Sequence, residues 1–375
     1  MAKIIMINKT FDLTVSKEYD MREISIEKFI SMKKVIPIDV RSPEEFNDYR
    51  IPGAVNIPLF SDEERAEIGT IYKQIGSEEA KWRAMEIVSP KIPSILGQIR
   101  EIQKEHLQPV IYCWRGGMRS KAVATFLSFS GLSIPRLIGG YRAYRQYILE
   151  KIPTIIPPQA ITLHGMTGVG KTEILLKLKE KGFPIIDLEG LANHRGSIFG
   201  TFGLSTGNNQ KTFDALLFQA LTEIKGAVFF IVEAESKRIG KVVQPDELFN
   251  TKLQGININL QAPMSSRVAR IYQEYVETFF QEEWFREKAD NNLSFIKKRM
   301  KDTNIIATLE DALLDENYEL FIQILLEDYY DPRYSYKQQE YAAPFYHIDA
   351  ENIDKAVEEI IGIIATEKSQ TNSRS

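Results

Sequence analysis

The segment Gly165–Thr172 (GMTGVGKT) limits the folds open to this chain more than any other stretch. The apolar run before it, 160–164, predicts a strand, and the pattern after it, 173–181, predicts a helix. The pattern G-x4-G-K-T between a strand and a helix is typical of a phosphate-binding P-loop, in which glycines let backbone amides wrap a phosphate. This part of the chain is therefore expected to form an α/β domain around a parallel sheet.

Residues in and beyond this loop are candidates for binding phosphate. Lys171 can neutralise phosphate charge, and the Thr172 hydroxyl can hold Mg²⁺. Glu233 ends the apolar strand expected at 226–233, which is the Walker B pattern, and such a carboxylate faces the ligand crevice. For charged residues such as Arg267, a solvent-exposed helix face is the alternative. The phosphate-binding residues predicted here are Gly165, Thr167, Gly168, Gly170, Lys171, Thr172, Asp187, Glu233 and Arg267.

The only cysteine of the chain lies in a second strand-to-helix loop. The run 109–112 predicts a short buried strand that ends before Cys113, and helical spacing begins at Ser120. Glycines let several N–H groups point at one anion, and arginines add positive charge, so the nucleophilic thiolate is favoured over the thiol. A buried structural cysteine is the usual alternative. The predicted catalytic and anion-binding residues are Cys113, Arg115, Gly116, Gly117 and Arg119.

The surroundings of Cys113 resemble the rhodanese domain. Segments 36–46 (IPIDVRSPEEF) and 51–59 (IPGAVNIPL) are similar to the N-terminal signatures of that family, whose members carry sulfur or selenium as a persulfide or perselenide on the loop cysteine. The basic residue Arg119 lies six positions after the cysteine, one more than in the common rhodanese loop. The spacing Cys-x5-Arg is also that of cysteine phosphatases. A phosphatase and a chalcogen carrier with a phosphorylated donor therefore both stay open.

A length of 375 residues suggests two domains, each able to bury a core. Prolines at 153, 157 and 158 mark the best boundary between them. We expect a rhodanese-like domain over 1–152, a P-loop NTPase/kinase-like three-layer α/β domain over 153–365, and a disordered tail over 366–375. A strand is also expected at 3–8.

The composition limits the classes of function. A formal net charge of −4 argues against nucleic-acid binding through bulk charge but leaves room for local basic patches. One cysteine excludes an intramolecular disulfide and a cysteine-rich zinc site, so we expect no metal held by cysteine or histidine and no tightly bound cofactor. The sequence starts without a signal peptide, and no apolar run approaches the ~18 residues of a membrane span. A cytoplasmic protein without membrane contact is expected.

Segment 329–336 (YYDPRYSY) places tyrosines beside an arginine. Aromatic and basic side chains in this mixture can stack on unpaired RNA bases. Packing in the core is an equally common reason for such tyrosines. RNA contact and core packing therefore both stay open for this segment.

The two halves together resemble the tRNA 2-selenouridine synthases. The likeness covers roughly 10–360 and is carried by 69–76 (GTIYKQIG), an insertion that a minimal rhodanese lacks, by 113–120 (CWRGGMRS), and by 187–197 (DLEGLANHRGS) after the P-loop. The resemblance implies a transferase that converts wobble 2-thiouridine in the anticodon loop of certain tRNAs to 2-selenouridine. The sulfur would first be geranylated from geranyl diphosphate. Selenium from selenophosphate, carried on Cys113 as a perselenide, would then replace the S-geranyl group.

The implied chemistry fits both loops. A thiocarbonyl sulfur leaves poorly, whereas S-alkylation lets it leave as a neutral thiol. Arg115, Arg119 and the loop amides would hold selenophosphate, and the P-loop would stabilise the diphosphate as it leaves the geranyl group. Two alternatives stay open, an ATP-dependent sulfurtransferase or kinase fusion and a Cys-x5-Arg phosphatase-like module. Against the phosphatase, the sequence shows no convincing general acid near the loop.

Overall fold

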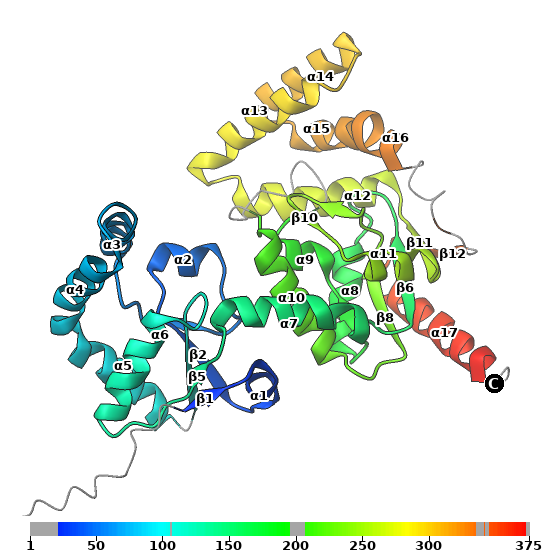
Figure 1. Cartoon of the computed structure of the whole chain (residues 1–375). Helices are drawn as coiled ribbons and strands as arrows, with labels where there is room; N and C mark the ends of the chain where they lie inside the picture. The colour runs from blue at the N-terminus through cyan, green and yellow to red at the C-terminus, as the bar shows by residue number, and fades with distance from the viewer. Residues whose placement is uncertain (1–21, 106, 196–206, 335–340, 342–344, 373–375) are drawn as a thin grey trace, which may run out of the picture. The chain divides into compact units, whose positions relative to one another are not determined.

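The chain divides into two compact units, Met1–Tyr147 and Ile148–Ser375. The computed structural model describes residues 22–105, 107–195, 207–334, 341 and 345–372. Within these residues, each unit contains a five-stranded parallel sheet flanked by helices (Figure 1). The predicted α/β class is confirmed. The strand expected at 3–8 lies outside the described residues.

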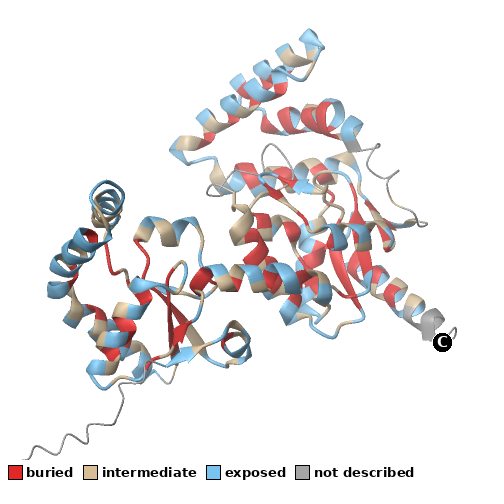
Figure 2. Ribbon diagram, in the orientation of Figure 1, coloured by how far each residue is buried: buried red, intermediate tan, exposed pale blue. Residues whose placement is uncertain are grey.

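In the first unit, the strand that precedes Cys113 lies in the middle of the sheet. The strand order is β1 (Glu23–Ile24), β5 (Arg136–Leu137), β4 (Gln108–Tyr112), β2 (Val35–Asp39) and β3 (Val55–Asn56). Helices α5 (Ile92–Lys104) and α6 (Met118–Phe129) pack against β4 through a core of buried aliphatic side chains, and buried residues are coloured red on the ribbon in Figure 2. Because β4 is central, Cys113 lies at the middle of the carboxyl edge of the sheet.

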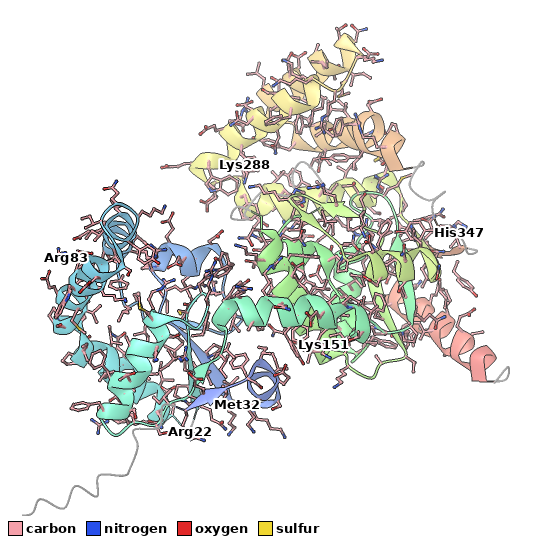
Figure 3. The ribbon with its side chains drawn as sticks, in the orientation of Figure 1. Arg22, Met32, Arg83, Lys151, Lys288 and His347 are labelled. Carbon is pink, nitrogen blue, oxygen red and sulfur yellow. The ribbon has the colours of Figure 1, made fainter. Side chains whose placement is uncertain are left out.

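The insertion at 69–76 forms the turn of a helical hairpin. It supplies the end of α3 (Asp62–Gln74) and the connection to α4 (Ser77–Val88). Arg83 on α4, labelled in Figure 3, pairs with Glu67 on α3 at 2.6 Å and with Glu86 on its own helix. A short 3-10 turn at Ser89–Lys91 then leads into α5. The remaining helices that begin in this unit are α1 (Ile26–Ser31), α2 (Pro43–Asp48) and α7 (Gly140–Ile155).

Helix α7 begins in the first unit and ends in the second. It continues through Pro153, although the sequence predicted a boundary between 152 and 153. A proline removes one helical hydrogen bond, and this one lies in the last turn, where few such bonds remain to be lost. The division between the compact units falls after Tyr147 and therefore inside a helix.

In the second unit, the strand that leads into the P-loop is central. The strand order is β12 (Phe345–Asp349), β11 (Ile256–Gln261), β6 (Gln159–His164), β8 (Phe229–Glu233) and β7 (Ile185–Ile186). Buried aliphatic side chains attach α8 (Lys171–Glu180) and α17 (Ile353–Asn372) to the sheet. A second helical group packs against the strands β6 and β7, which gives the expected three layers. Its members are α9 (Leu188–Ala192), α10 (Gln210–Glu223) and α11 (Asp246–Leu253).

A group of helices between β11 and β12 has its own apolar core (yellow to orange in Figure 1). Tyr329 and Tyr330 are buried in it, so core packing rather than contact with RNA accounts for these two tyrosines. Residues 335 and 336 of the same predicted segment lie outside the described residues. The group contains α12 (Met264–Ile271), a π-helical turn (Tyr272–Glu277), α13 (Glu283–Lys297), α14 (Thr303–Leu314), α15 (Tyr318–Ile324), a second π-helical turn (Leu325–Tyr330) and α16 (Asp331–Tyr334).

The last helix, α17, continues to Asn372. Residues 366–372, expected to be disordered, are therefore helical, because adding residues to an existing helix avoids the cost of a new nucleus. Residues 373–375 lie outside the described part of the chain. Among the described residues, none of the helices combines the length and the apolar character needed to cross a membrane.

Candidate functional site

Cys113 directly follows β4 and begins the loop that leads into α6. Its side chain is 3% exposed, and its Sγ lies 3.2 Å from Ser120 Oγ. The Ser120 hydroxyl also donates to Gly117 O at 3.3 Å. A hydroxyl has a single proton, so Ser120 accepts from a Cys113 thiol in this arrangement and can turn to donate to a thiolate. The predicted nucleophile thus has a hydrogen-bond partner that suits either form.

Glycines permit the close packing that fixes this loop. Tyr141 N, at the start of α7, donates to Cys113 O at 2.9 Å. Gly140 has a φ of +56°, and a Cβ there would lie 2.1 Å from Cys113 O. Gly116 has a φ of +60°, and its Cβ would lie 2.8 Å from Leu137 O. The sequence pointed to Gly116 but not to Gly140, although the glycine pair at 139 and 140 after β5 was a visible signal.

The two predicted arginines of this loop differ in their surroundings. Arg115 is exposed and makes no ion pair with the described residues. Arg119 donates to both carboxylate oxygens of Glu45 on α2, and the distance from Arg119 Nη2 to Glu45 Oε1 is 3.1 Å. Burial would raise the pKa of Glu45, but the hydrogen bonds and charge of Arg119, with help from Ser42 N and Arg65, lower it below its ordinary value. Glu45, which the sequence did not single out, is thus an ionised partner of Arg119.

A buried arginine and several aromatic rings support the other side of the loop. Arg41 is fully buried, pairs with Asp39 at 2.6 Å, and lies 4.8 Å from the ring centre of Tyr49. Trp114, the residue after the cysteine, stacks on Tyr141 with ring centres 5.7 Å apart. Tyr49 and Tyr141 are themselves in contact, with ring centres 4.7 Å apart. The residue next to the nucleophile is therefore fixed by a rigid cluster.

The P-loop begins at the end of β6 and closes at the start of α8. Lys171 Nζ donates to Gly165 O at 2.7 Å, so the lysine lies across the loop. Thr172 Oγ1 donates to Glu233 Oε1 at 3.3 Å. Gly170, just before the helix, has a φ of +95°, the left-handed region that favours glycine. The structure thus brings together Lys171, Thr172 and Glu233, as the sequence predicted.

Glu233 is fully buried at the end of β8. Burial raises the pKa of this carboxyl well above its ordinary range, the charges of Glu189, Asp187 and Glu235 raise it further, and Lys171 opposes the shift. Its Oε2 is buried and has no hydrogen-bond partner within the described residues. That oxygen, beside Thr172, fits the binding of a cation, and Mg²⁺ here would screen the phosphate charge. The described residues contain no cluster of three or more His, Cys, Asp or Glu side chains suited to a metal.

Two other predicted residues have structural partners of their own. Asp187 caps α9, because its Oδ1 accepts from Gly190 N at 2.8 Å. Arg267 is 4% exposed, donates to Thr167 O at 2.9 Å and pairs with Asp331 at 2.6 Å. These contacts hold the P-loop from outside, so a direct contact between Arg267 and phosphate stays a prediction. The geometry supports a positioning role for Arg267.

Both regions match known families. Residues 25–147 match the family model described as a rhodanese-like domain, and residues 158–362 match that described as the tRNA 2-selenouridine synthase AAA domain. The chain is thus a rhodanese-like domain joined to a P-loop α/β domain. Proteins named tRNA 2-selenouridine synthase from Hydrogenovibrio crunogenus and Pseudomonas syringae pv. syringae are 34% and 33% identical to it, over 83% and 82% of this chain and 91% and 89% of theirs. The chain belongs to the tRNA 2-selenouridine synthase family.

A further relative extends this comparison. The protein of the same name from Bdellovibrio bacteriovorus is 36% identical, over 64% of this chain and 65% of its own length. The matched ranges of the two family models contain Cys113 and Lys171 respectively. Each of the two loops therefore lies inside a recognised domain.

Proposed function

We propose that this protein is a transferase that modifies tRNA by converting wobble 2-thiouridine to 2-selenouridine. The observation that carries the proposal is the presence of two glycine-containing strand-to-helix loops in one chain, one with a cysteine and one without. Relatives of similar length carry the name tRNA 2-selenouridine synthase. The expected partners are tRNA, selenophosphate and geranyl diphosphate, in the cytoplasm.

The P-loop is proposed to bind geranyl diphosphate. Amides at the start of α8 and the Lys171 ammonium would hold the diphosphate and stabilise it as the C–O bond to geranyl breaks. The sulfur of 2-thiouridine forms a bond to the geranyl carbon, and the diphosphate leaves with the electron pair of the broken C–O bond. The product is an S-geranyl group that can later depart as a thiol.

The Cys113 loop is proposed to bind selenophosphate and deliver its selenium. Arg115 and Arg119 provide cations, and the loop glycines allow amides to face the tetrahedral oxyanion. Selenium then adds to C2 of the S-geranyl nucleoside, and the geranyl thiolate leaves. The net conversion consumes selenophosphate and water and yields phosphate and geranylthiol, without a change of oxidation state.

One assay tests the function as a whole. The full-length protein is incubated with 2-thiouridine tRNA, geranyl diphosphate and selenophosphate, and the nucleosides are analysed by mass spectrometry. We expect S-geranyl-2-thiouridine and 2-selenouridine, the first without selenophosphate and both with it. If neither nucleoside forms with folded protein and intact tRNA, the proposed function is wrong.

A nucleotide-dependent sulfurtransferase is the second candidate. The contact between Thr172 and the buried Glu233 suits a Mg²⁺-nucleotide as well as a Mg²⁺-diphosphate. Omitting ATP distinguishes the two, because geranylation requires no nucleotide. Product formation that depends on ATP hydrolysis would favour the second candidate.

A further inference from the structure

We propose that Cys113 attacks the phosphorus of selenophosphate, forms a phosphocysteine and releases selenide as the leaving group. The proposal rests on the proposed function, since it specifies how the same loop uses the same donor. It replaces the perselenide that the rhodanese likeness implies with a different covalent intermediate.

The oxidation states of the reactants favour attack at phosphorus. Selenophosphate holds selenium at the level of selenide and phosphorus at the level of phosphate. A perselenide is one electron pair more oxidised than a thiolate and a selenide together. Making it with release of phosphate needs an oxidant, and passing its selenium to carbon as selenide then needs a reductant. Attack at phosphorus needs neither.

Each step through phosphorus balances. The Cys113 Sγ–P bond forms as the P–Se bond of the selenium-protonated donor breaks, and selenium leaves with that electron pair and that proton as hydroselenide (HSe⁻). Hydroselenide adds to C2 of the S-geranyl nucleoside, its proton passes to N3, and the geranyl thiolate leaves and is protonated by water. Water then hydrolyses the phosphocysteine to phosphate and the Cys113 thiol.

The geometry of the loop suits a phosphorus centre. The spacing from Cys113 to Arg119 leaves five residues between them, one more than in the common rhodanese loop, and a longer loop has more room for a tetrahedral group. Arg119 can present two N–H groups to two phosphoryl oxygens, as it now does to the two oxygens of Glu45. Ser120 Oγ, 3.2 Å from Sγ, can donate to the sulfur when the S–P bond breaks, which stabilises the departing thiolate.

The leaving group removes the main objection to phosphatase-like chemistry. A phosphate ester needs an acid to protonate its leaving oxygen, and the loop offers none. Glu45, the carboxylate that contacts Arg119, has its pKa below the ordinary value and is an anion rather than a proton donor. Hydroselenide, which departs with the proton that the donor already carries on selenium, is weakly basic and needs no such acid. The loop is therefore suited to a phosphorylated chalcogen and unsuited to an ordinary ester.

A double-label experiment distinguishes the two intermediates. The full-length protein is mixed with selenophosphate labelled in phosphorus or in selenium, quenched in acid, and digested to locate the label. Mass alone is insufficient, because selenium and HPO₃ add nearly the same mass. We expect radioactive phosphorus on Cys113 and radioactive selenium in solution. Selenium label on Cys113 without phosphorus label overturns the proposal, as does selenouridine formation with no phosphorylated protein at any quench time.

Variants separate the chemical role of Ser120 from a structural one. Cys113→Ser should leave no label on the peptide. Ser120→Ala should still become labelled, but the phosphocysteine should persist about tenfold longer, the effect of one lost hydrogen bond to the leaving sulfur. Ser128→Ala, the same change on the same helix but away from the loop, should behave as the unchanged protein. Equal phosphocysteine lifetimes in the unchanged protein, Ser120→Ala and Ser128→Ala would remove Ser120 from the mechanism.

Labelled thiophosphate makes failure of this inference distinguishable from failure of the proposed function. It has the same charge and shape as selenophosphate and releases hydrosulfide. Phosphorylation of Cys113 by thiophosphate, with no selenouridine formed from selenophosphate, would support the phosphocysteine and contradict the selenium function. Selenouridine formation with selenium label on Cys113 would support the selenium function and contradict the phosphocysteine.

Discussion

The Cys113 loop and the P-loop are built alike and differ in what they place beside the anion. Each follows the central strand of a parallel sheet, contains a glycine with a positive φ, and leads into the amide end of a helix. The first adds a buried thiol and arginines at its mouth. The second adds a lysine that lies across the loop and a buried carboxyl group. The proposed function assigns covalent chemistry to the first of these loops and electrostatic stabilisation to the second.

The largest expected effect tests whether only the first loop supplies a nucleophile. Cys113→Ser replaces a thiol with a hydroxyl, which is a far weaker nucleophile at neutral pH. We expect 2-selenouridine formation to vanish and S-geranyl-2-thiouridine to accumulate, as measured by nucleoside mass spectrometry. Continued geranylation is the internal control for folding. Full selenation by this variant would show that the loops do not divide the work in this way.

Lys171→Ala is the converse test. In the proposed function the lysine neutralises diphosphate charge as the geranyl C–O bond breaks, an interaction worth several kcal/mol in P-loop chemistry, so geranylation should fall at least about a hundredfold. The variant should still convert tRNA supplied already geranylated. Lys177→Ala, on the exposed side of α8 where it pairs with Asp354, is the matched control. Loss of conversion of the geranylated tRNA would mean that the P-loop also acts in the selenium step.

A third test concerns stability and applies only to the second unit. His164, at the end of β6, is buried beside Asn257, and burial lowers its pKa to about 4. Below pH 6.5 the unfolded chain takes up a proton that the folded chain does not, so stability falls as the pH drops from about 6.5 to about 4. The total loss is about 3 kcal/mol.

His164→Gln should remove this fall in stability between about pH 6.5 and about pH 4, which is measured from the midpoints of urea unfolding. Gln retains a donor for Asn257 and carries no titrating group. His347→Gln, at an exposed position on β12, is the control and should leave the dependence in place. If the stability of the His164 variant falls with pH as steeply as that of the unchanged protein, other groups cause the acid sensitivity.

The smallest expected effect concerns competition for Arg119. An anionic donor has to displace Glu45 from this arginine, so Glu45→Gln should lower the apparent KM for selenophosphate by about tenfold. Gln is also acceptable at this position of the capping box on α2, so the helix start is preserved. Arg119→Ala should raise the same constant by about tenfold or more. Glu44→Gln, the exposed neighbour, controls for net charge, and a weaker affinity in Glu45→Gln would mean that Glu45 orients Arg119.

The sequence was sufficient where a short segment determines both shape and chemistry. The GMTGVGKT and CWRGGMR loops were predicted with their flanking strands and helices, because glycine placement and hydrophobic spacing are local signals. Glu45 and Arg267 were harder, since their partners Arg119 and Asp331 are distant in the chain and an ion pair leaves no local pattern. The sequence around Tyr329 and Tyr330 is compatible both with stacking on RNA and with packing in a core. Only the packing of these tyrosines with helices α13 to α15 distinguished the two roles.

The contact between Gly140 and the Cys113 carbonyl has a consequence for any survey of sequence variants. A methyl group at 140 would have to occupy space 2.1 Å from that oxygen, at a φ of +56° that side chains seldom adopt. Tolerance to substitution at this position should therefore be as low as at the nucleophile itself, although Gly140 contributes no atom to the reaction. In a saturation library scored only by growth, a backbone spacer and a reactive thiol would give the same readout. Purified Gly140→Ala protein, compared with Cys113→Ser for thermal stability, separates them, because only the former should unfold at a lower temperature.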